Sequence, residues 1–128
     1  MTELHAAPEP DAARPSDGRT RVALSNALVR IWKEHYGRGP TSARAIVDGS
    51  MVFVILQDGL TRNEETLLAA GRQQVVRDFR AAFMDTMREH FNAAVAEITG
   101  RAVLAHECQM VFEPTMTVEI FVLDGPIQ

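Results

Sequence analysis

Apolar residues recur at helical spacing between Arg19 and Tyr36, where Leu24, Leu28 and Ile31 mark one face. A spacing of three and four residues is typical of an amphipathic helix whose apolar stripe faces a core. Gly37 follows the last periodic residue and suits the position where a left-handed residue ends a helix. The pattern therefore predicts a first helix over residues 19–36.

Two apolar segments, 43–47 and 51–57, flank the dipeptide Asp48-Gly49. Asp-Gly is a strong hairpin signal because both loop positions of a type I′ turn require a positive φ. We expect an antiparallel hairpin with these two residues as its loop, so that Val47 pairs with Ser50.

A second helix is predicted to begin at Arg62, because Thr61 and Glu64 form a capping-box pattern. Helical spacing then continues to the sequence "ITG", and Gly71 is a point where this long helix breaks or bends. The apolar positions expected to face the core are Val75, Val76, Phe79, Phe83, Met87, Phe91, Val95 and Ile98. The charged positions expected on the other side are Arg77, Asp78, Arg80, Asp85, Arg88 and Glu89.

The C-terminal region reads as two strands, 102–112 and 117–123, around the sequence "EPTM". Pro114 suits the second position of a type I turn, which predicts a loop longer than two residues. The element order is then helix, hairpin, helix, hairpin (αββαββ). This order indicates an α+β fold with a four-stranded, mainly antiparallel sheet and helices packed on one face.

Both faces of the strands at 51–56 and 118–123 are apolar, which is expected only when a strand is covered on both sides. Two helices can cover one face of a four-stranded sheet, so the other face needs a second molecule. A homodimer is the simplest solution, with Met51, Phe53, Ile55 and Phe121 as candidate interface residues.

The 128 residues fit one domain, and the composition adds an N-terminal arm. Residues 1–18 are rich in acidic residues, proline and alanine, which favours a disordered arm ahead of a single domain at 19–128. A net charge of −4 argues against a nucleic-acid binder. No apolar run is long enough to insert into a membrane and no secretory signal is recognisable, so we expect a cytoplasmic protein.

No reaction follows from the polar residues. His106 and Cys108 share one face of a strand, but two side chains do not make a metal site, and a buried thiol is the simpler interpretation. Glu107 and Glu119 are the most plausible carboxylate pair for acid and base chemistry, although exposed strand positions explain them equally well. We therefore predict no catalytic residue, no metal, no cofactor and no enzymatic activity.

The loop "GRGP" at residues 37–40 is the best candidate for a ligand site. Gly37 and Gly39 allow a close approach of the backbone to a ligand, and Arg38 and Arg44 could meet an anion. The alternative interpretation is a helix end followed by a solvated arginine.

Three separated motifs resemble the bacterial MpsC-like family, long described as a domain of unknown function. They are the Gly-Lys/Arg-Gly-Pro loop at residues 37–40, the Leu-Thr-x-x-Glu helix start at residues 60–64 and the "ITG" helix exit at residues 98–100. The resemblance covers about residues 19–124. It implies a small soluble partner of a sodium-translocating, membrane-potential-generating system linked to inorganic-carbon supply. No catalytic residues are implied.

Two functions from different classes are consistent with these observations. The first is a cytoplasmic accessory or regulatory domain that acts by protein association, with itself or with a protein of the membrane system. The alternative is a small anion-binding or ligand-binding module that uses the "GRGP" loop.

Overall fold

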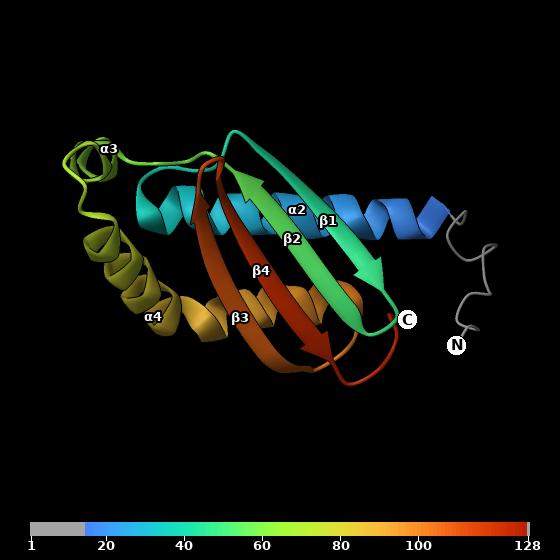
Figure 1. Cartoon of the computed structure of the whole chain (residues 1–128). Coiled ribbons are helices and arrows are strands. Elements are labelled where there is room, and N and C mark those ends of the chain that lie inside the picture. The colour runs from blue at the N-terminus through green and yellow to red at the C-terminus, as the bar shows by residue number, and fades with distance from the viewer. Residues whose placement is uncertain (1–14, 128) are drawn as a thin grey trace, which may run out of the picture.

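The computed structural model describes residues 15–127, which form three helices and one four-stranded antiparallel sheet (Figure 1). The helices are α2 (Pro15–Tyr36), α3 (Arg62–Ala69) and α4 (Gln73–Thr99). The strands are β1 (Ser42–Asp48), β2 (Met51–Gln57), β3 (Val103–Phe112) and β4 (Thr115–Leu123). The expected α+β class and antiparallel sheet are confirmed. The expected αββαββ order is wrong, because two helices, not one, separate the hairpins.

The predicted long helix is interrupted at Gly71. The N–H of Gly71 donates to the carbonyl of Leu68 at 3.0 Å, and the N–H of Arg72 donates to the carbonyl of Leu67 at 2.8 Å. These two bonds form a Schellman motif, which needs a left-handed residue, and Gly71 has a φ of 76°. The chain therefore turns here and starts a separate helix, α4, at Gln73.

The first helix begins at Pro15, four residues before the predicted start at Arg19. Proline is tolerated in a first helical turn because the N–H that it lacks has no acceptor within the helix. Residues 15–18, which were expected to belong to the disordered arm, are therefore part of α2. The rest of the predicted arm, residues 1–14, lies outside the described residues.

Both hairpins have two-residue loops, and both differ from the prediction. In the first, Asp48 pairs with Met51, so the loop is Gly49-Ser50 and not Asp48-Gly49. The pairing shifts by two positions, which leaves every side chain on its predicted face, since side chains alternate with a period of two. In the second hairpin, residues 112 and 115 pair around Glu113-Pro114, whose peptide bond is cis, so the expected longer type I loop is wrong.

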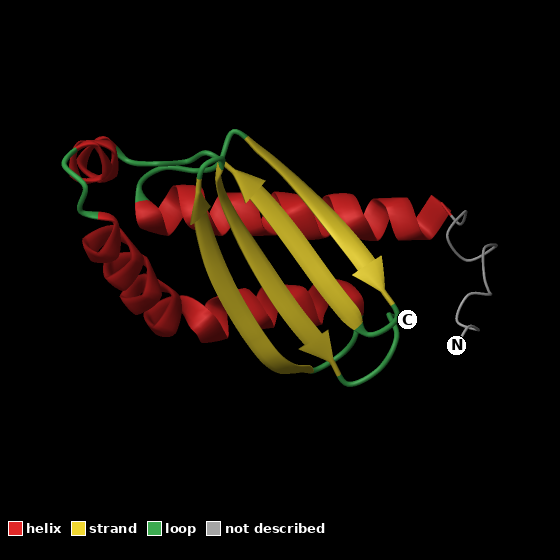
Figure 2. Cartoon of the chain, viewed as in Figure 1, coloured by secondary structure: helices red, strands yellow, loops and turns green. Residues whose placement is uncertain are grey.

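The strand order is β1-β2-β4-β3, so β2 and β4 are the central strands. Helices α2 and α4 both lie on one face of the sheet, and α3 lies beyond the end of the strands (Figure 2). The core between the helices and the sheet is built mainly from Leu24, Leu28, Trp32, Val52, Val54, Phe91, Val95 and Phe121. We call the other face of the sheet, which no helix of the described residues covers, the open face.

The apolar face of α4 is rotated from the predicted one in its first half. Phe79, expected in the core, is 63% exposed, whereas Arg80, expected outside, is only 6% exposed. The buried positions Val76, Arg80 and Met84 follow one another at intervals of four residues, so a charged side chain occupies the middle of the buried stripe.

The segment after β2 crosses close to the "GRGP" loop. Gly59 has a φ of +89°, and a Cβ added there would lie 3.1 Å from Cα of Pro40. Gly71 also has a positive φ, of +76°, but a Cβ there would meet no atom within 4 Å. Substitutions at these two glycines therefore distinguish the cost of a left-handed backbone, present at both, from the cost of close packing, present only at Gly59.

We expect Gly71→Ala to lower the free energy of unfolding by about 1–2 kcal/mol, the cost of a left-handed alanine. Gly59→Ala should cost about 1–3 kcal/mol more, because its new methyl group also overlaps Pro40. Urea unfolding of the two variants measures the difference directly. Equal losses would show that the contact between Gly59 and Pro40 contributes nothing.

Candidate functional site

A bidentate ion pair joins Arg80 of α4 to Glu64 of α3. Nε of Arg80 donates to Oε2 of Glu64 at 2.7 Å, and Nη2 donates to Oε1 at 2.8 Å. The two side chains are only 7% and 5% exposed. Charges at this depth are tolerated only when they are paired and hydrogen-bonded, so each residue depends on the other.

The guanidinium of Arg80 also contacts the rest of the domain. Its Nη2 donates to the carbonyl of Gly59 at 3.2 Å, and Nη1 lies 3.4 Å from Oγ1 of Thr117 on β4. Its carbon lies 5.1 Å and 4.6 Å from the ring centroids of Trp32 and Tyr36, both on α2. One side chain therefore connects all three helices with the sheet.

Glu64 is likewise saturated with hydrogen bonds. It accepts one from the backbone N–H of Thr61 at 2.9 Å, which completes the predicted capping box, and another from the hydroxyl of Tyr36. Burial alone would raise the pKa of Glu64, but the hydrogen bonds from Arg80 and Tyr36 outweigh burial and hold this pKa below its usual value. Burial and the Glu64 carboxylate raise the pKa of Tyr36. At neutral pH the pair is therefore ionised.

A second polar cluster lies deeper, around the fully buried Glu119 of β4. Nε1 of Trp32 donates to Oε2 of Glu119 at 2.8 Å, and Nε2 of His106 lies 2.9 Å from Oε1. The His106 ring stacks on Phe121 at 4.2 Å, and its Nδ1 has no hydrogen-bond partner among the described residues. Trp32 contacts both clusters, because its ring lies under Arg80 while its N–H binds Glu119.

The two carboxylates considered as a candidate acid and base pair, Glu107 and Glu119, lie on opposite faces of the sheet. Glu119 points into the core, whereas Glu107 is exposed on the open face, since its register partner is Ile120 and not Glu119. Glu119 meets His106 instead. Among residues 15–127, no three His, Cys, Asp or Glu side chains are grouped so that they could hold a metal ion.

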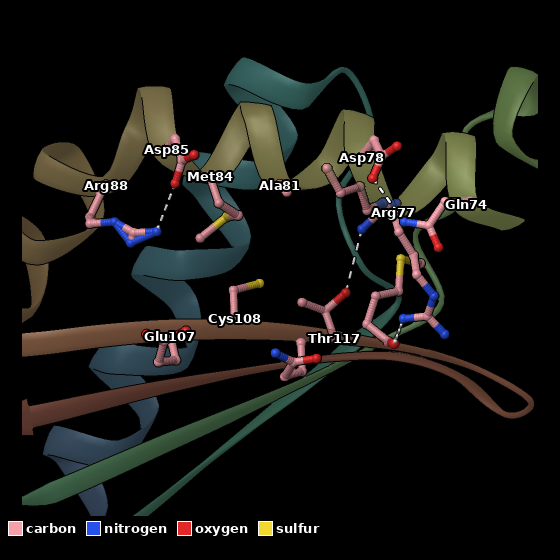
Figure 3. A pocket seen from close by; sticks show the side chains of 13 residues that line it. Gln74, Arg77, Asp78, Ala81, Met84, Asp85, Arg88, Glu107, Cys108 and Thr117 are labelled. Atoms are coloured by element: carbon pink, nitrogen blue, oxygen red, sulfur yellow. Dashed lines mark hydrogen bonds and ion pairs between the residues drawn. The ribbon is translucent and has the colours of Figure 1, made fainter.

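A cavity of about 360 Å³ lies between α4 and the edge strand β3, and Cys108 points into it (Figure 3). Arg77 and Arg88 reach down from α4 to β3, where they donate to the carbonyls of Met110 at 2.8 Å and His106 at 3.3 Å. Ala81 lies between these arginines on α4 (Figure 3), and its small side chain contributes to the open space.

The groups that line this cavity do not form a reactive site. Burial and the nearby Glu119 raise the pKa of the Cys108 thiol, so it is protonated at neutral pH and is a weak nucleophile. Of the three guanidinium groups that face the cavity, that of Arg80 is paired with Glu64, and those of Arg77 and Arg88 are balanced by the carboxylates of Asp78 and Asp85. The cavity therefore offers neither an activated group nor a net charge that would attract an anion.

The predicted ligand loop forms the connection between α2 and β1. Gly37 has a φ of 93°, as its predicted role at the helix end requires, and a Cβ at Gly39 would lie 3.1 Å from Cβ of Lys33. Arg38 and Arg44 are exposed, and neither forms a hydrogen bond or ion pair with another described residue. Both glycines thus have structural roles, and ligand binding by the two arginines stays a prediction.

Three of the four candidate interface residues, Met51, Phe53 and Ile55, lie on the open face and are partly exposed. The prediction that the fourth, Phe121, lies in the interface is wrong, because its side chain is completely buried on the helix side of β4. Side chains of β4 alternate, so its neighbour Ile120 occupies the open face instead.

A family model described as "Na+-translocating membrane potential-generating system (MpsC)" matches residues 16–125. The chain belongs to the MpsC family. No curated protein and no solved structure matches it. Within residues 15–127, no helix combines the length and hydropathy that crossing a membrane requires. Membership in MpsC associates this chain with a sodium-translocating system that generates a membrane potential.

Arg80 is the central residue that sequence reasoning missed. It was assigned to the solvated side of the helix because it is charged and follows Phe79 in an apolar stripe. The one available signal was its spacing of four residues from both Val76 and Met84, which places all three on one side of a helix. That signal competes with the stronger rule that arginine is rarely buried.

We expect Glu64→Gln and Arg80→Met each to lower the free energy of unfolding by about 3–5 kcal/mol, because each leaves one buried charge unpaired. Glutamine still fits the capping box. The double variant should cost clearly less than the sum of the two, since it buries no unpaired charge. Denaturant unfolding of the four proteins measures this coupling.

The exposed pair between Arg88 and Asp85, at 3.0 Å, is the matched control. Asp85→Asn should cost less than about 1 kcal/mol, because solvent screens this pair. Strict additivity of the Glu64 and Arg80 substitutions would contradict the proposed dependence of each charge on the other.

The lowered pKa of Glu64 predicts a specific pH dependence. A carboxyl group with a lower pKa in the folded state stabilises the fold above its unfolded pKa, near 4.5, and loses this effect as the pH falls through the folded pKa. The stability gap between wild type and Glu64→Gln should therefore be full near neutral pH and shrink in acid. Urea unfolding from about pH 7 to about pH 3 tests this. An unchanged gap across that range would exclude an ionised Glu64 as its cause.

Proposed function

We propose that this chain is a cytoplasmic accessory or regulatory component of the sodium-translocating, membrane-potential-generating system and that it acts by binding proteins, not by catalysis. Its family membership supplies the link to the system. The observation that carries the binding role is the open face. Seven of its eight positions on β2 and β4 are apolar, namely Met51, Phe53, Ile55, Met116, Val118, Ile120 and Val122.

An apolar sheet face is expected to be covered by another surface, because an antiparallel sheet that faces water normally carries polar residues there. Alternate side chains of β2 point to opposite faces of the sheet, so the burial of the two faces can be compared within this one strand. Val52, Val54 and Leu56 are buried by the helices, whereas the intervening Phe53 and Ile55 are only partly buried. The second set has the composition of a core but lacks the second layer, which supports a protein partner on this side.

The polar residues of the domain support the non-catalytic part of the proposal. Glu64, Arg80 and Glu119 are each bound to other buried side chains, and the thiol of Cys108 is protonated. Groups that are saturated in this way hold the packing of helices on the sheet and have no free position for a substrate.

We expect the variant Phe53→Thr/Ile120→Thr to fold with nearly wild-type stability, because threonine suits an exposed strand. It should nevertheless fail to restore the sodium-dependent membrane potential of cells that lack the gene. A potential-sensitive dye measures this in cells complemented with each variant, and thermal unfolding of the purified proteins confirms folding.

Val22→Thr provides the control, because Val22 is 59% exposed on α2 and remote from the open face. It should restore the potential as wild type does. A folded Phe53→Thr/Ile120→Thr protein that fully restores the potential would refute the role of the open face.

A further inference from the structure

The two edge strands of the sheet, β1 and β3, differ in how their outer backbone groups are occupied. In an antiparallel sheet, alternate residues of a strand direct their N–H and C=O groups to the same neighbouring strand. The N–H of Asp58 donates to the carbonyl of Thr115, and the N–H of Leu123 donates to the carbonyl of Ser50. The even-numbered residues in and beside β2 therefore bond to β4, and the odd-numbered residues bond to β1.

This alternation fixes which backbone groups point outward at the two edges. The even-numbered residues of β1 pair with the odd-numbered residues of β2, so the outer groups of β1 belong to Ala43, Ala45 and Val47. On β3 the outer groups include those of His106 and Met110, because the odd-numbered residues of this strand bond to β4.

The outer edge of β3 is covered by side chains of α4. Arg77 and Arg88 donate to the carbonyls of Met110 and His106, at 2.8 Å and 3.3 Å respectively. The guanidinium carbon of Arg77 also lies 4.6 Å from the ring centroid of Phe112, at the end of the same strand. A strand added here would have to displace both arginines, so this edge is closed to pairing.

The outer edge of β1 has no such cover. Within residues 15–127, no strand or side chain binds the outer backbone groups of Ala43, Ala45 and Val47. In Figure 2, β1 forms the free margin of the sheet, and α2 passes across its other face. Ala45 is only 6% exposed, so its outer groups meet little water. Backbone groups that are poorly hydrated and unpaired cost free energy, which an added strand would recover.

The charges of β1 make this strand complementary to a second copy of itself. Its two charged residues, Arg44 and Asp48, are exposed and lie two positions before and two positions after Ile46. Ile46 shares their face of the sheet and is 40% exposed. An antiparallel copy with Ile46 opposite Ile46 therefore places each Arg44 opposite the partner's Asp48. Opposite charges and branched apolar residues in such positions both stabilise adjacent strands.

We propose that β1 pairs with β1 of a second copy of this chain, about a two-fold axis that is perpendicular to the sheet and passes beside Ile46. The outer groups of Ala45 then bond to those of the partner's Val47, and those of Val47 bond to the partner's Ala45. The two sheets join into one continuous sheet, with both open faces on the same side. This contact goes beyond the function proposed above, because it leaves the open face free.

Other antiparallel registers lose the direct pairing of charges. A register centred on Arg44 or on Asp48 sets two like charges opposite each other, which opposes association. A register centred on Ala45 forms two more backbone bonds, but it places each Arg44 opposite the partner's Ile46. The charged residues of α2 lie across the sheet from Arg44 and Asp48, so they do not distinguish these registers. Only the register centred on Ile46 forms both ion pairs directly.

A disulfide at the axis tests this register. The two copies of residue 46 would form a pair whose Cβ atoms lie about 4.5–5.5 Å apart, so Ile46→Cys should link two chains under mild oxidation. Phe53→Cys is the matched control, because Phe53 is the register partner of Ile46 on β2. Its two copies would lie three strand spacings apart, roughly 14 Å, and should not link. The wild-type chain controls for Cys108, and non-reducing electrophoresis measures the linked fraction.

A charge exchange tests the ion pairs, with sedimentation as the measurement. One strand pair buries a small area, so we expect the wild-type dimer to dissociate at about 0.1 mM. Its mass should approach twice 14.2 kDa above that concentration. Arg44→Glu and Asp48→Lys should each weaken the dimer at least about 5-fold, because each creates two like-charge contacts. The double variant should return to within about 3-fold of wild type, and far-ultraviolet circular dichroism checks each fold.

Each other outcome overturns the arrangement. A wild-type chain that stays monomeric up to about 1 mM excludes a second copy as the partner of β1. A dimer that links through Phe53→Cys and not through Ile46→Cys uses the open face, and one that links through neither has another register or surface. Failure of the double charge exchange to restore the dimer excludes direct pairing of Arg44 with Asp48. None of these outcomes affects the proposed function, which the cell experiment tests through residues of the open face.

Discussion

The fold depends on the burial of one positive charge, the guanidinium of Arg80. It is balanced by Glu64, which lies sixteen residues earlier in the chain. In a continuous helix, that separation would correspond to about 24 Å, far beyond the reach of the two side chains. The interruption at Gly71 is therefore a geometric requirement, because only a turn between α3 and α4 returns Glu64 to Arg80. The helix break at Gly71, the capping box at Thr61 and the ion pair between Glu64 and Arg80 therefore depend on one another.

The same charge explains why two aromatic residues of α2 lie where they do. Trp32 and Tyr36, one turn apart, present their rings to Arg80 and their polar atoms to Glu119 and Glu64. A purely apolar layer could fill this space, and buried ion pairs are often no more stabilising than hydrophobic replacements. What the polar contacts add is direction, since each hydrogen bond requires its donor and acceptor to meet at a defined distance and angle. We attribute the specific packing of the helices to this network.

The sequence was sufficient for those features that depend on local pattern. The helix start at Arg62, the helix end at Gly100 and the two apolar faces of β2 follow from capping and periodicity, and the structure confirms them. The first hairpin shows why such inference tolerates error. Its turn was misplaced by one residue, yet every side chain kept its face, because pairing then shifts by two.

Features that depend on tertiary contact were not accessible in the same way. Nothing near Arg80 in sequence reveals that Glu64, Tyr36 and Thr117 converge on it, so general preference placed it in solvent. Phe79 was misassigned for the complementary reason, since a large aromatic side chain normally indicates a core position. Phe121 was assigned to the wrong face of β4. Every position of "VEIFVL" other than Glu119 is apolar, so the sequence pattern does not distinguish the two faces of the strand.

Strand β4 unites the two sides of the molecule. Thr117, Glu119 and Phe121 face the helices and take part in the buried network or core, whereas Val118 and Ile120 between them face outward. The open face can act as a binding surface only if its central strand is held in one register, because a slip by one residue would bring Glu119 to the surface and Ile120 to the core. The two hydrogen bonds to Glu119 oppose that slip. In this way the buried polar groups, which perform no chemistry of their own, fix the surface through which the protein is proposed to act.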